Sequence, residues 1–362
     1  MRAGESSTVD VAILGGGIIG LSVAWRARAR GMSVAVLERG EIGAGATHVA
    51  AGMLAPVAEV EFGEAARGVL ELGLRSAEMW PSFAAELQRD SSIDVGLRRT
   101  GTLVVARDDD EARELERQFA FRESLGLRAM RMRPSEARER EPALAPTVRL
   151  ALHAPDDHSV DPRNVVAALL SACERAGTRL SEHVSALDVR LDAGERRVTG
   201  VGDLRARNVV VAAGAWSGEI AGLPAGAGVR VRPVKGQIMR LRDPAGPGLL
   251  ERVVRFEGGY LVPRGDGRYV LGATMEERGF DADPTAGGAY ELLRNAHELV
   301  PGIGELRIEE LNVGFRPCTP DNTPIVGRGK LDGLVWATGH HRNGVLLAPL
   351  TAEVVVEALW SS

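Results

Sequence analysis

The stretch VDVAILGGGIIG at residues 9–20 decides the fold. An apolar run leads directly into a G-x-G-x-x-G pattern, and a helical pattern follows it, which is the arrangement of a dinucleotide-binding βαβ unit. Gly15 allows the tight turn, Gly17 lets the backbone approach a pyrophosphate at the helix N-terminus, and Gly20 lets helix and strand pack closely. The stretch therefore predicts a nucleotide domain built on a parallel sheet.

A second apolar run, VAVLER at residues 34–39, ends in an acid twenty-one residues after Gly17. Glu38 is placed to accept hydrogen bonds from adenosine ribose hydroxyls, and its charge would repel a 2′-phosphate, which argues against NADP. Arg39 beside it weakens that argument, because an arginine can accommodate the phosphate. FAD and NAD both remain open on this fingerprint alone.

Composition narrows the class of protein. The chain has 362 residues, 44% hydrophobic and 26% charged, which is ordinary for a globular protein and long enough for about two domains. A net charge of -5 gives no support for nucleic-acid binding. Two cysteines, Cys173 and Cys318, are too few for a disulfide framework and lack metal-ligand spacing. With no signal-peptide or membrane-span pattern, we expect a soluble, cytoplasmic protein without metal.

The pattern along the chain indicates a discontinuous nucleotide domain. Residues 63–89, 108–125 and 163–176 read as helices, the last capped by Asp161, and the run VVVAAGAWS at residues 209–217 reads as a second strand-to-loop unit far from the first. Between residues 229 and 311 the pattern turns β-rich, with a hairpin over residues 259–272. A final helix is expected from about residue 345 to 359.

Six further segments carry a family pattern in order along the chain. They are AAGML (50–54), PVKGQ (233–237), YLVPR (260–264), GATM (272–275), GFRP (314–317) and GHHRNG (339–344). Together with the fingerprint they resemble the D-amino-acid oxidase group of FAD-dependent amine oxidases, and most closely the thiamine-biosynthetic glycine oxidase branch. The resemblance covers nearly the whole chain and favours FAD over NAD.

The resemblance implies an α/β fold in which a discontinuous Rossmann-like FAD domain is joined to a β-rich antiparallel substrate domain. The FAD-binding domain is expected over residues 1–90, 147–226 and 322–362, and the substrate-binding domain over residues 91–146 and 227–321. FAD is expected to bind non-covalently, because the offset of Cys318 from Thr319-Pro320-Asp321 does not suit the covalent attachment of related sarcosine oxidases.

The implied activity is oxidative deamination of glycine and other small amines, such as sarcosine and small D-amino acids. The products are the imine or 2-oxo acid and hydrogen peroxide formed from O2, and the glycine imine is expected to supply the thiamine thiazole. A D-amino acid dehydrogenase, which passes electrons to a quinone, and a sarcosine oxidase remain alternatives, and a dinucleotide-binding sensor is the non-enzyme alternative. The family also implies a homo-oligomer. The preferred amine, the electron acceptor and the oligomeric state are left open.

Five residues are expected to bind or enclose the substrate. Arg316 lies in the otherwise apolar LNVGFRP segment, where an unpaired guanidinium is costly and needs an anionic partner, and its fork suits a substrate carboxylate. The resemblance implies that Tyr260 adds its hydroxyl to that carboxylate and that Arg342 lies by both flavin and substrate. Met53 and Met275 are expected to be soft walls of the pocket.

The remaining candidates are expected to hold the cofactor. The small-residue loop from Ala46 to Met53 would lie along the isoalloxazine, and the turn from His340 to Gly344 would present backbone N–H groups to the flavin N1/O2 edge. His48 and His341 depart from the family pattern, and His48, His340 and His341 lack the spacing of a metal site. The full expected cofactor-binding set is Gly15, Gly17, Ile18, Ile19, Gly20, Glu38, Arg39, Ala46, Thr47, Ala51, Gly52, Met53, Val184, Gly214, His340, His341, Arg342, Asn343, Gly344, Val345 and Leu346.

Overall fold

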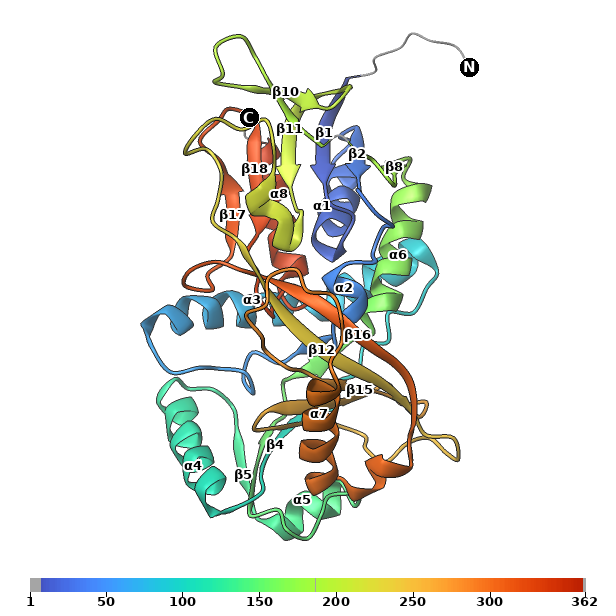
Figure 1. Ribbon diagram of the computed structural model, residues 1–362, viewed down its shortest axis with the longest axis vertical. Helices are drawn as coiled ribbons and strands as arrows, with labels where there is room; N and C mark the ends of the chain where they lie inside the picture. Colours follow the sequence, from blue (N-terminus) through green and yellow to red (C-terminus); the bar gives the residue numbers. More distant parts are fainter. Residues whose placement is uncertain (1–7, 186, 361–362) are drawn as a thin grey trace.

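A computed structural model describes residues 8–185 and 187–360, and it contains two eight-stranded sheets placed one above the other in Figure 1. The first sheet has the order β17-β18-β11-β1-β2-β8, and β9 and β10 extend it through β11. Its strands are β1 (Val9–Leu14), β2 (Val34–Leu37), β8 (Arg179–Ser181), β9 (Val189–Leu191), β10 (Val198–Val201), β11 (Leu204–Val211), β17 (Ile325–Arg328) and β18 (Leu334–Thr338).

The fingerprint forms the centre of this first sheet. β1 pairs in parallel with both β11 and β2, so residues far apart in the chain become neighbours. α1 (Ile18–Ala29), α6 (Pro162–Arg175) and α8 (Ala348–Trp360) pack with α3 (Glu64–Ser91) into one apolar core beside it. The predicted discontinuous Rossmann-like domain is therefore confirmed as a fold, because its sheet draws strands from three separate parts of the chain.

The second sheet has the order β16-β12-β15-β14-β13-β4-β6-β5 and is antiparallel except where β13 meets β4. Its strands are β4 (Thr102–Ala106), β5 (Met130–Met132), β6 (Leu150–Ala154), β12 (Arg232–Arg242), β13 (Val253–Phe256), β14 (Gly259–Pro263), β15 (Arg268–Gly272) and β16 (Arg307–Cys318). β3 (Met53–Leu54) and β7 (His158–Ser159) form a separate small pair. The predicted β-rich second unit is confirmed.

Period-two alternation gives the second sheet two different faces. Val254, Leu261 and Leu271 lie opposite one another on three strands and pack against the apolar side of α7 (Ala286–Leu299). The residues next to them in sequence point to the other face, toward the first sheet.

Five further helices of the described part of the chain lie outside the elements named above. They are α2 (Ala46–Val49), α4 (Asp109–Ser124), α5 (Pro134–Arg140), η1 (Gly214–Glu219) and η2 (Pro301–Glu305).

Three details differ from the sequence expectations. α7 interrupts the segment predicted as β-rich, although its signal is present, with Thr285 as N-cap and buried Leu292 and Leu299 at helical spacing. α8 begins at Ala348 rather than near residue 345, with Pro349 in its first turn, where proline is favoured. The predicted boundary at 147 places β6 with the nucleotide domain, whereas β6 pairs with β4 in the second sheet. The domain boundaries themselves stay a prediction.

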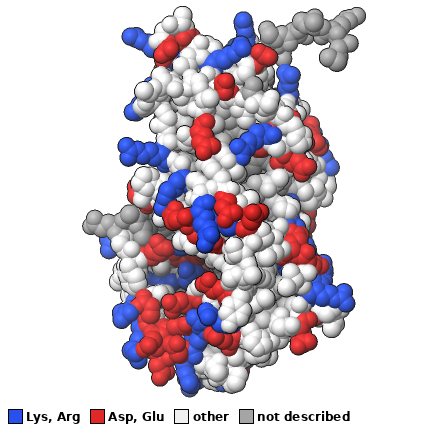
Figure 2. Space-filling view, in the orientation of Figure 1, with Lys and Arg blue, Asp and Glu red and all other residues white. Residues whose placement is uncertain are grey.

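α4 is the charged, solvent-facing helix that its sequence predicts. Asp108 caps it by accepting from the N–H groups of Asp110 and Glu111, and Glu114 pairs with Arg117 on its surface. Figure 2 shows acidic side chains gathered low on the left, where Figure 1 places α4. Within the described ranges, none of the helices has the length and apolar character needed to cross a bilayer.

Candidate active site

A cavity of about 930 Å³ lies between the two sheets, at the upper end of the range of small-molecule sites. Its wall combines the end of β1 and the start of α1 with the inner face of the second sheet. The predicted residues that line it are Gly15, Gly17, Ile18, Ile19, Glu38, Arg39, Ala46, Thr47, Ala51, Gly52, Met53, Gly214, Tyr260, Met275, Arg316, His340, His341, Arg342, Gly344 and Val345. Motifs spread over the whole chain are therefore brought to one place.

Gly20 and Val184, two of the predicted cofactor residues, lie outside this wall. A side chain on Gly20 would approach the Gly15 carbonyl oxygen to 2.0 Å, so Gly20 acts through the close helix–strand packing expected of it. Val184 uses its N–H to donate to the Glu38 carbonyl at 3.0 Å, and Leu187 lines the cavity instead. A contact between Val184 and adenine stays a prediction.

Two predicted residues of the C-terminal turn also lie behind the wall. Asn343 donates its N–H to the His340 carbonyl and accepts from the N–H of Leu347, which fixes the turn. Leu346 is buried, and its carbonyl accepts from the side chains of Ser76 and Trp80 on α3. Both residues therefore position the lining residues beside them.

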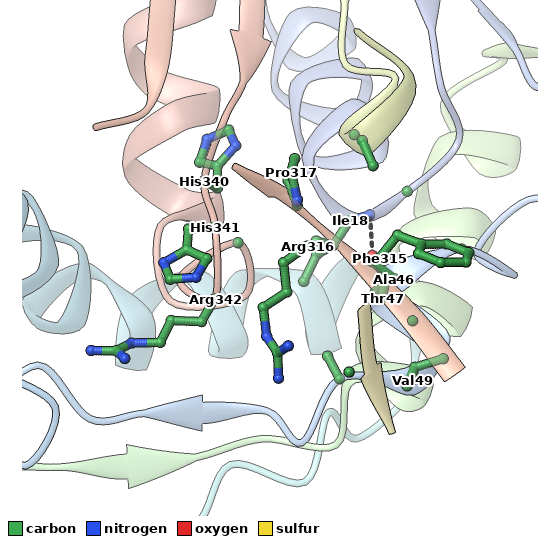
Figure 3. A pocket seen from close by; sticks show the side chains of 18 of the residues that line it. Ile18, Ala46, Thr47, Val49, Phe315, Arg316, Pro317, His340, His341 and Arg342 are labelled. Atoms are coloured by element: carbon green, nitrogen blue, oxygen red, sulfur yellow. Dashed lines mark hydrogen bonds between the residues drawn. The ribbon is translucent and has the colours of Figure 1, made fainter. Parts of the chain in front are cut away.

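The N-terminus of α1 fits the phosphate groups of a dinucleotide. Gly17 is the N-cap and has no side chain with which to cap the helix, and the first turn holds no acid, so the positive end of the helix faces the cavity. The Thr47 hydroxyl accepts from the Ile18 N–H at 3.2 Å (Figure 3). Glu38 is fixed beside this end by the N–H groups of Gly16 and Gly40, at 2.8 and 2.9 Å.

An aromatic cluster lies beside Arg39 at the cavity wall, and the sequence motifs do not predict it. The Arg39 guanidinium lies 3.9 Å from the ring centroid of Trp216, a cation–π contact. Phe280 stacks on Trp216 at 4.9 Å with an interplanar angle of 12°, and Phe315 meets both rings edge-on. Trp216 belongs to η1, and Phe280 belongs to the loop before α7. The cluster therefore joins distant parts of the chain beside Arg39.

Buried arginines behind the wall hold the small-residue loop. Arg163 and Arg240 both donate to the His48 carbonyl, at 3.2 and 2.7 Å, and Arg264 donates to the Ala51 carbonyl at 2.8 Å. Glu310 pairs with Arg163 at 2.6 Å, and hydrogen bonding from that arginine lowers the pKa of Glu310 to about 2. These hydrogen bonds hold the loop from Ala46 to Met53 in place. This is the loop that the sequence predicts to lie along the isoalloxazine ring.

The C-terminal turn presents part of its backbone to the cavity. The N–H of His341 donates to the Pro317 carbonyl at 2.9 Å, while the N–H groups of Arg342, Gly344 and Val345 form no backbone hydrogen bond within the described part of the chain. The His340 ring points away from the cavity and meets the Thr351 hydroxyl at 2.9 Å. The turn can therefore offer N–H donors to a ligand, as the sequence predicts.

Both histidines of this turn are neutral at pH 7. Burial lowers the pKa of His340 to about 4, and burial together with Arg342 and Arg316 lowers the pKa of His341 to about 4. Neutral imidazoles add no positive charge beside the two arginines. Among the described residues that line this part of the wall, the positive charge therefore comes from Arg316 and Arg342.

Acid is expected to destabilise the protein through His340. Its pKa is near 6.5 in the unfolded chain and about 4 in the folded protein, so its contribution to stability is present above pH 6.5 and is lost as pH falls toward 4. In that window one proton changes the free energy of unfolding by about 1.4 kcal/mol per pH unit. Urea unfolding at pH 7 and pH 5 should give a smaller loss for His340→Gln than for the unaltered protein. An equal loss would contradict this assignment.

Arg316 reaches into the cavity from β16, a strand of the second sheet. Its Nη1 donates to the carbonyls of Thr274 and Lys235, at 3.1 and 3.3 Å, and it forms no ion pair with any residue that the structure describes. A side chain at Gly236 would come within 2.4 Å of that nitrogen, so this glycine makes room for the guanidinium. The anionic partner that the sequence predicts for Arg316 is thus not supplied by any of the described residues.

Tyr260, Met53 and Met275 line the same cavity as Arg316. Burial raises the pKa of Tyr260, so its hydroxyl remains a proton donor, and that hydroxyl makes no hydrogen bond to another described residue. Met53 is half-buried in the wall, whereas Met275 is 61% exposed at the rim. The Tyr260 hydroxyl and the Arg316 guanidinium can therefore both donate hydrogen bonds to a ligand in the cavity.

The Arg342 side chain pairs with acidic residues of the loop before α3. It lines the cavity, but in Figure 3 its side chain extends away from the space into which Arg316 points. It pairs with Glu61 at 2.7 Å and donates to the Glu59 carbonyl at 3.0 Å. Burial opposes its charge, but Glu59 and Glu61 outweigh burial and raise the pKa of Arg342. Its expected contact with flavin and substrate stays a prediction.

Comparison with known proteins identifies the family of this chain. Residues 10–358 match the family model described as FAD dependent oxidoreductase. The chain is 37% identical to a glycine oxidase of Geobacillus kaustophilus over 96% of its own length and 92% of that protein. It is 35% identical to a bifunctional ThiO/ThiG protein of Trichormus variabilis, covering 97% of this chain and 52% of that one.

A solved structure shares the same architecture. The crystal structure of glycine oxidase from Geobacillus kaustophilus superposes with a TM-score of 0.89 at 34% identity, covering 98% of this chain and 95% of that one. The uncapped helix N-terminus, the fixed Glu38 carboxylate and the large cavity fit FAD, the cofactor of the matched family. With the family model spanning nearly the whole chain, this protein belongs to the FAD-dependent oxidoreductases of the D-amino-acid oxidase family.

Proposed function

We propose that this protein oxidises glycine and other small amines, sarcosine and small D-amino acids among them, with O2 as electron acceptor. The observation that carries the proposal is the Arg316 guanidinium, which faces the cavity without an acidic partner among the described residues. A substrate carboxylate would supply that charge, with a bidentate geometry that suits arginine. The similarity to glycine oxidases supports glycine as the first choice.

The protein's own residues would bind and orient the substrate. Arg316 would bind the carboxylate and the Tyr260 hydroxyl would donate to it, which fixes the Cα–N bond relative to the cavity wall. Bound FAD would supply two-electron oxidation by accepting a hydride from the substrate Cα. No side chain has to act as a strong base, because a neutral amine needs only correct placement, and positioning can supply a large part of the rate.

The balanced reaction is glycine plus O2 plus water giving glyoxylate, ammonia and hydrogen peroxide. The imine formed first is either hydrolysed or handed to thiazole synthesis. The ThiO/ThiG similarity supports the second route, because that relative carries a further segment beyond the half that this chain matches.

A cytoplasmic location is consistent with Cys173 and Cys318, which are both free and buried. A homo-oligomer remains part of the proposal.

Purified protein should be yellow, and each chain should release one FAD on denaturation. Glycine is expected to bleach the flavin without oxygen, and to give one hydrogen peroxide for each O2 consumed when oxygen is present. An oxygen electrode used with glycine, sarcosine, D-alanine and D-proline would rank the substrates. Bleaching by amines without oxygen consumption, restored by a quinone, would instead support a dehydrogenase. FAD binding with no bleaching by any amine would support a sensor.

A further inference from the structure

A second, smaller cavity lies beside the loop from Ala46 to Met53. Its volume is about 60 Å³, which is enough for several water-sized groups. We call it the arginine chamber, and its lining residues are Arg163 from α6, Arg240 from β12, Arg264 after β14, Arg268 and Tyr269 from β15, and Glu309 and Glu310 from β16. The two cavities share none of the described lining residues, so the chamber is distinct from the candidate active site.

Arg240 and Arg264 form the buried end of the chamber. Their side chains are 9% and 4% exposed, whereas that of Arg268 is 38% exposed. Both buried guanidinium groups also hold the neighbouring loop, because Arg240 donates to the His48 carbonyl and Arg264 to the Ala51 carbonyl. A ligand at the buried end would therefore act on the loop through two hydrogen bonds that are already formed.

The buried guanidinium groups have donors without an acceptor. The only side-chain hydrogen bond from Arg240 to a described residue runs from Nη2 to the His48 carbonyl. Its Nε is buried without a partner, and a Glu310 oxygen lies 3.7 Å away, beyond hydrogen-bonding distance. Nε of Arg264 is likewise buried and unpaired, with an Asp161 oxygen 3.8 Å away. Neither guanidinium thus has a carboxylate within hydrogen-bonding distance among the described residues.

The acids near the chamber are paired with other groups. Glu310 accepts from Arg163 with both carboxylate oxygens, at 2.7 and 2.6 Å. Glu309 pairs with Arg242, which lies outside the chamber wall. Asp161 caps α6 by accepting from the N–H of Arg163 at 3.1 Å. Turning any of these carboxylates toward the buried end would break an existing hydrogen bond.

The electrostatics of the buried end favour an anion. Burial lowers the pKa of Arg240 and lowers that of Arg264 to about 10, and repulsion by neighbouring arginines adds to both effects. Both groups still carry a charge at pH 7, and a buried charge without a hydrogen-bonded partner is costly. Water could accept their hydrogen bonds but could not neutralise the charge. An anion would do both.

We propose that the arginine chamber binds one small inorganic oxyanion, such as phosphate or sulfate, and that this anion holds the loop from Ala46 to Met53 in place. Arg240 supplies its free donors, Arg264 its buried charge, and Arg268 the charge at the partly exposed end. Guanidinium groups suit oxyanions because their N–H groups form a fork that matches the oxygen atoms. The site takes no part in amine oxidation, so it does not depend on the proposed substrate.

The first test measures thermal unfolding of the FAD-loaded enzyme at pH 7, because bound FAD occupies the large cavity. Sodium chloride is replaced stepwise by sodium phosphate or sodium sulfate at constant ionic strength. The unfolding temperature should rise with a saturating dependence, by about 2 °C at a concentration tenfold above the dissociation constant. Exclusion of these ions from the protein surface also stabilises, but without saturation. The ion that saturates at the lower concentration is the better ligand.

Variants place the anion. Arg268→Met and Arg240→Met should each remove the saturating part of the rise and leave the linear part. Arg131→Met is the matched control, because Arg131 is also partly exposed and pairs with Glu116 away from the chamber. Arg131→Met and Arg316→Met should both keep the saturating rise. Its loss in Arg316→Met alone would place the anion in the large cavity and overturn the proposal. A linear rise in every protein would indicate an adventitious ion only, with the same consequence.

The second test follows the loop by hydrogen exchange and mass spectrometry. Amides of residues 46–53 in the FAD-loaded enzyme should exchange at least about fivefold more slowly at a saturating concentration of the better anion. Arg268→Met should show no such slowing. A saturating rise in unfolding temperature with unaltered exchange in the loop would overturn the effect of the anion on the loop. Oxygen uptake with glycine tests the proposed function separately.

Discussion

Glycine oxidation is expected to fall about a hundredfold in kcat/KM when Arg316 is replaced by methionine. Methionine keeps most of the side-chain volume but removes the guanidinium that faces the cavity. Loss of one partner from an enclosed charge pair costs roughly 3 kcal/mol, which is about a hundredfold in binding or rate. Steady-state oxygen uptake with glycine measures the effect.

The companion variant Arg316→Lys separates charge from geometry. Lysine keeps the positive charge but loses the bidentate fork, so its apparent KM for glycine should rise by an amount equivalent to about 2 kcal/mol. FAD content should stay at one per chain in both variants, because Arg316 contacts carbonyls of the second sheet rather than the fingerprint. If both variants oxidised glycine with unaltered kcat/KM, Arg316 would have only a structural role.

FAD affinity is expected to weaken about tenfold to a hundredfold in Gly344→Val. A Cβ atom at Gly344 would have no neighbour closer than 3.8 Å, so the protein itself has room for valine. The side chain would instead enter the cavity beside the N–H donors of the turn, where crowding costs roughly 1–3 kcal/mol. Absorbance at 450 nm per chain after purification, and titration of the apoprotein with FAD, measure the loss.

Gly228→Val is the matched control for this variant. Gly228 also has open space around a Cβ atom, but it lies outside the cavity wall. Its FAD content and thermal stability should match those of the unaltered protein. Full flavin occupancy in Gly344→Val would place the flavin away from the C-terminal turn, and a loss in both variants would indicate damage to folding.

Most of the site residues predicted from local motifs line the cavity. Gly15, Gly17 and Glu38 could be recognised because tight turns and close backbone approach demand particular residues at a fixed spacing. Arg316 could be recognised because a charge in an apolar segment needs an explanation. In each case the physical demand lies within a few residues of chain, so the pattern is visible without knowledge of the partners.

The unpredicted residues depend on contacts between distant segments. Trp216 and Phe280 are in contact although they lie 64 residues apart in the sequence. Neither segment carries a pattern that predicts a contact with the other. Arg255 sits in a strand whose alternation predicts two faces but not which face meets a cavity. The pairing of Arg342 with Glu61 likewise depends on how the loop before α3 folds over the C-terminal turn. Such residues become visible only once the sheet order is known.

The order of strands in the first sheet has a consequence for how the chain folds. β1 and β2 are made early in synthesis, but β11 follows β2 by more than 160 residues, and β18 and α8 come at the very end. Contacts of such long sequence separation slow folding, because a large loop must close before the pairing stabilises it. Until β18 arrives, β11 presents an open strand edge and α1 lacks the apolar partner that α8 provides. A chain synthesised without β18 and α8 is therefore expected to be prone to aggregation.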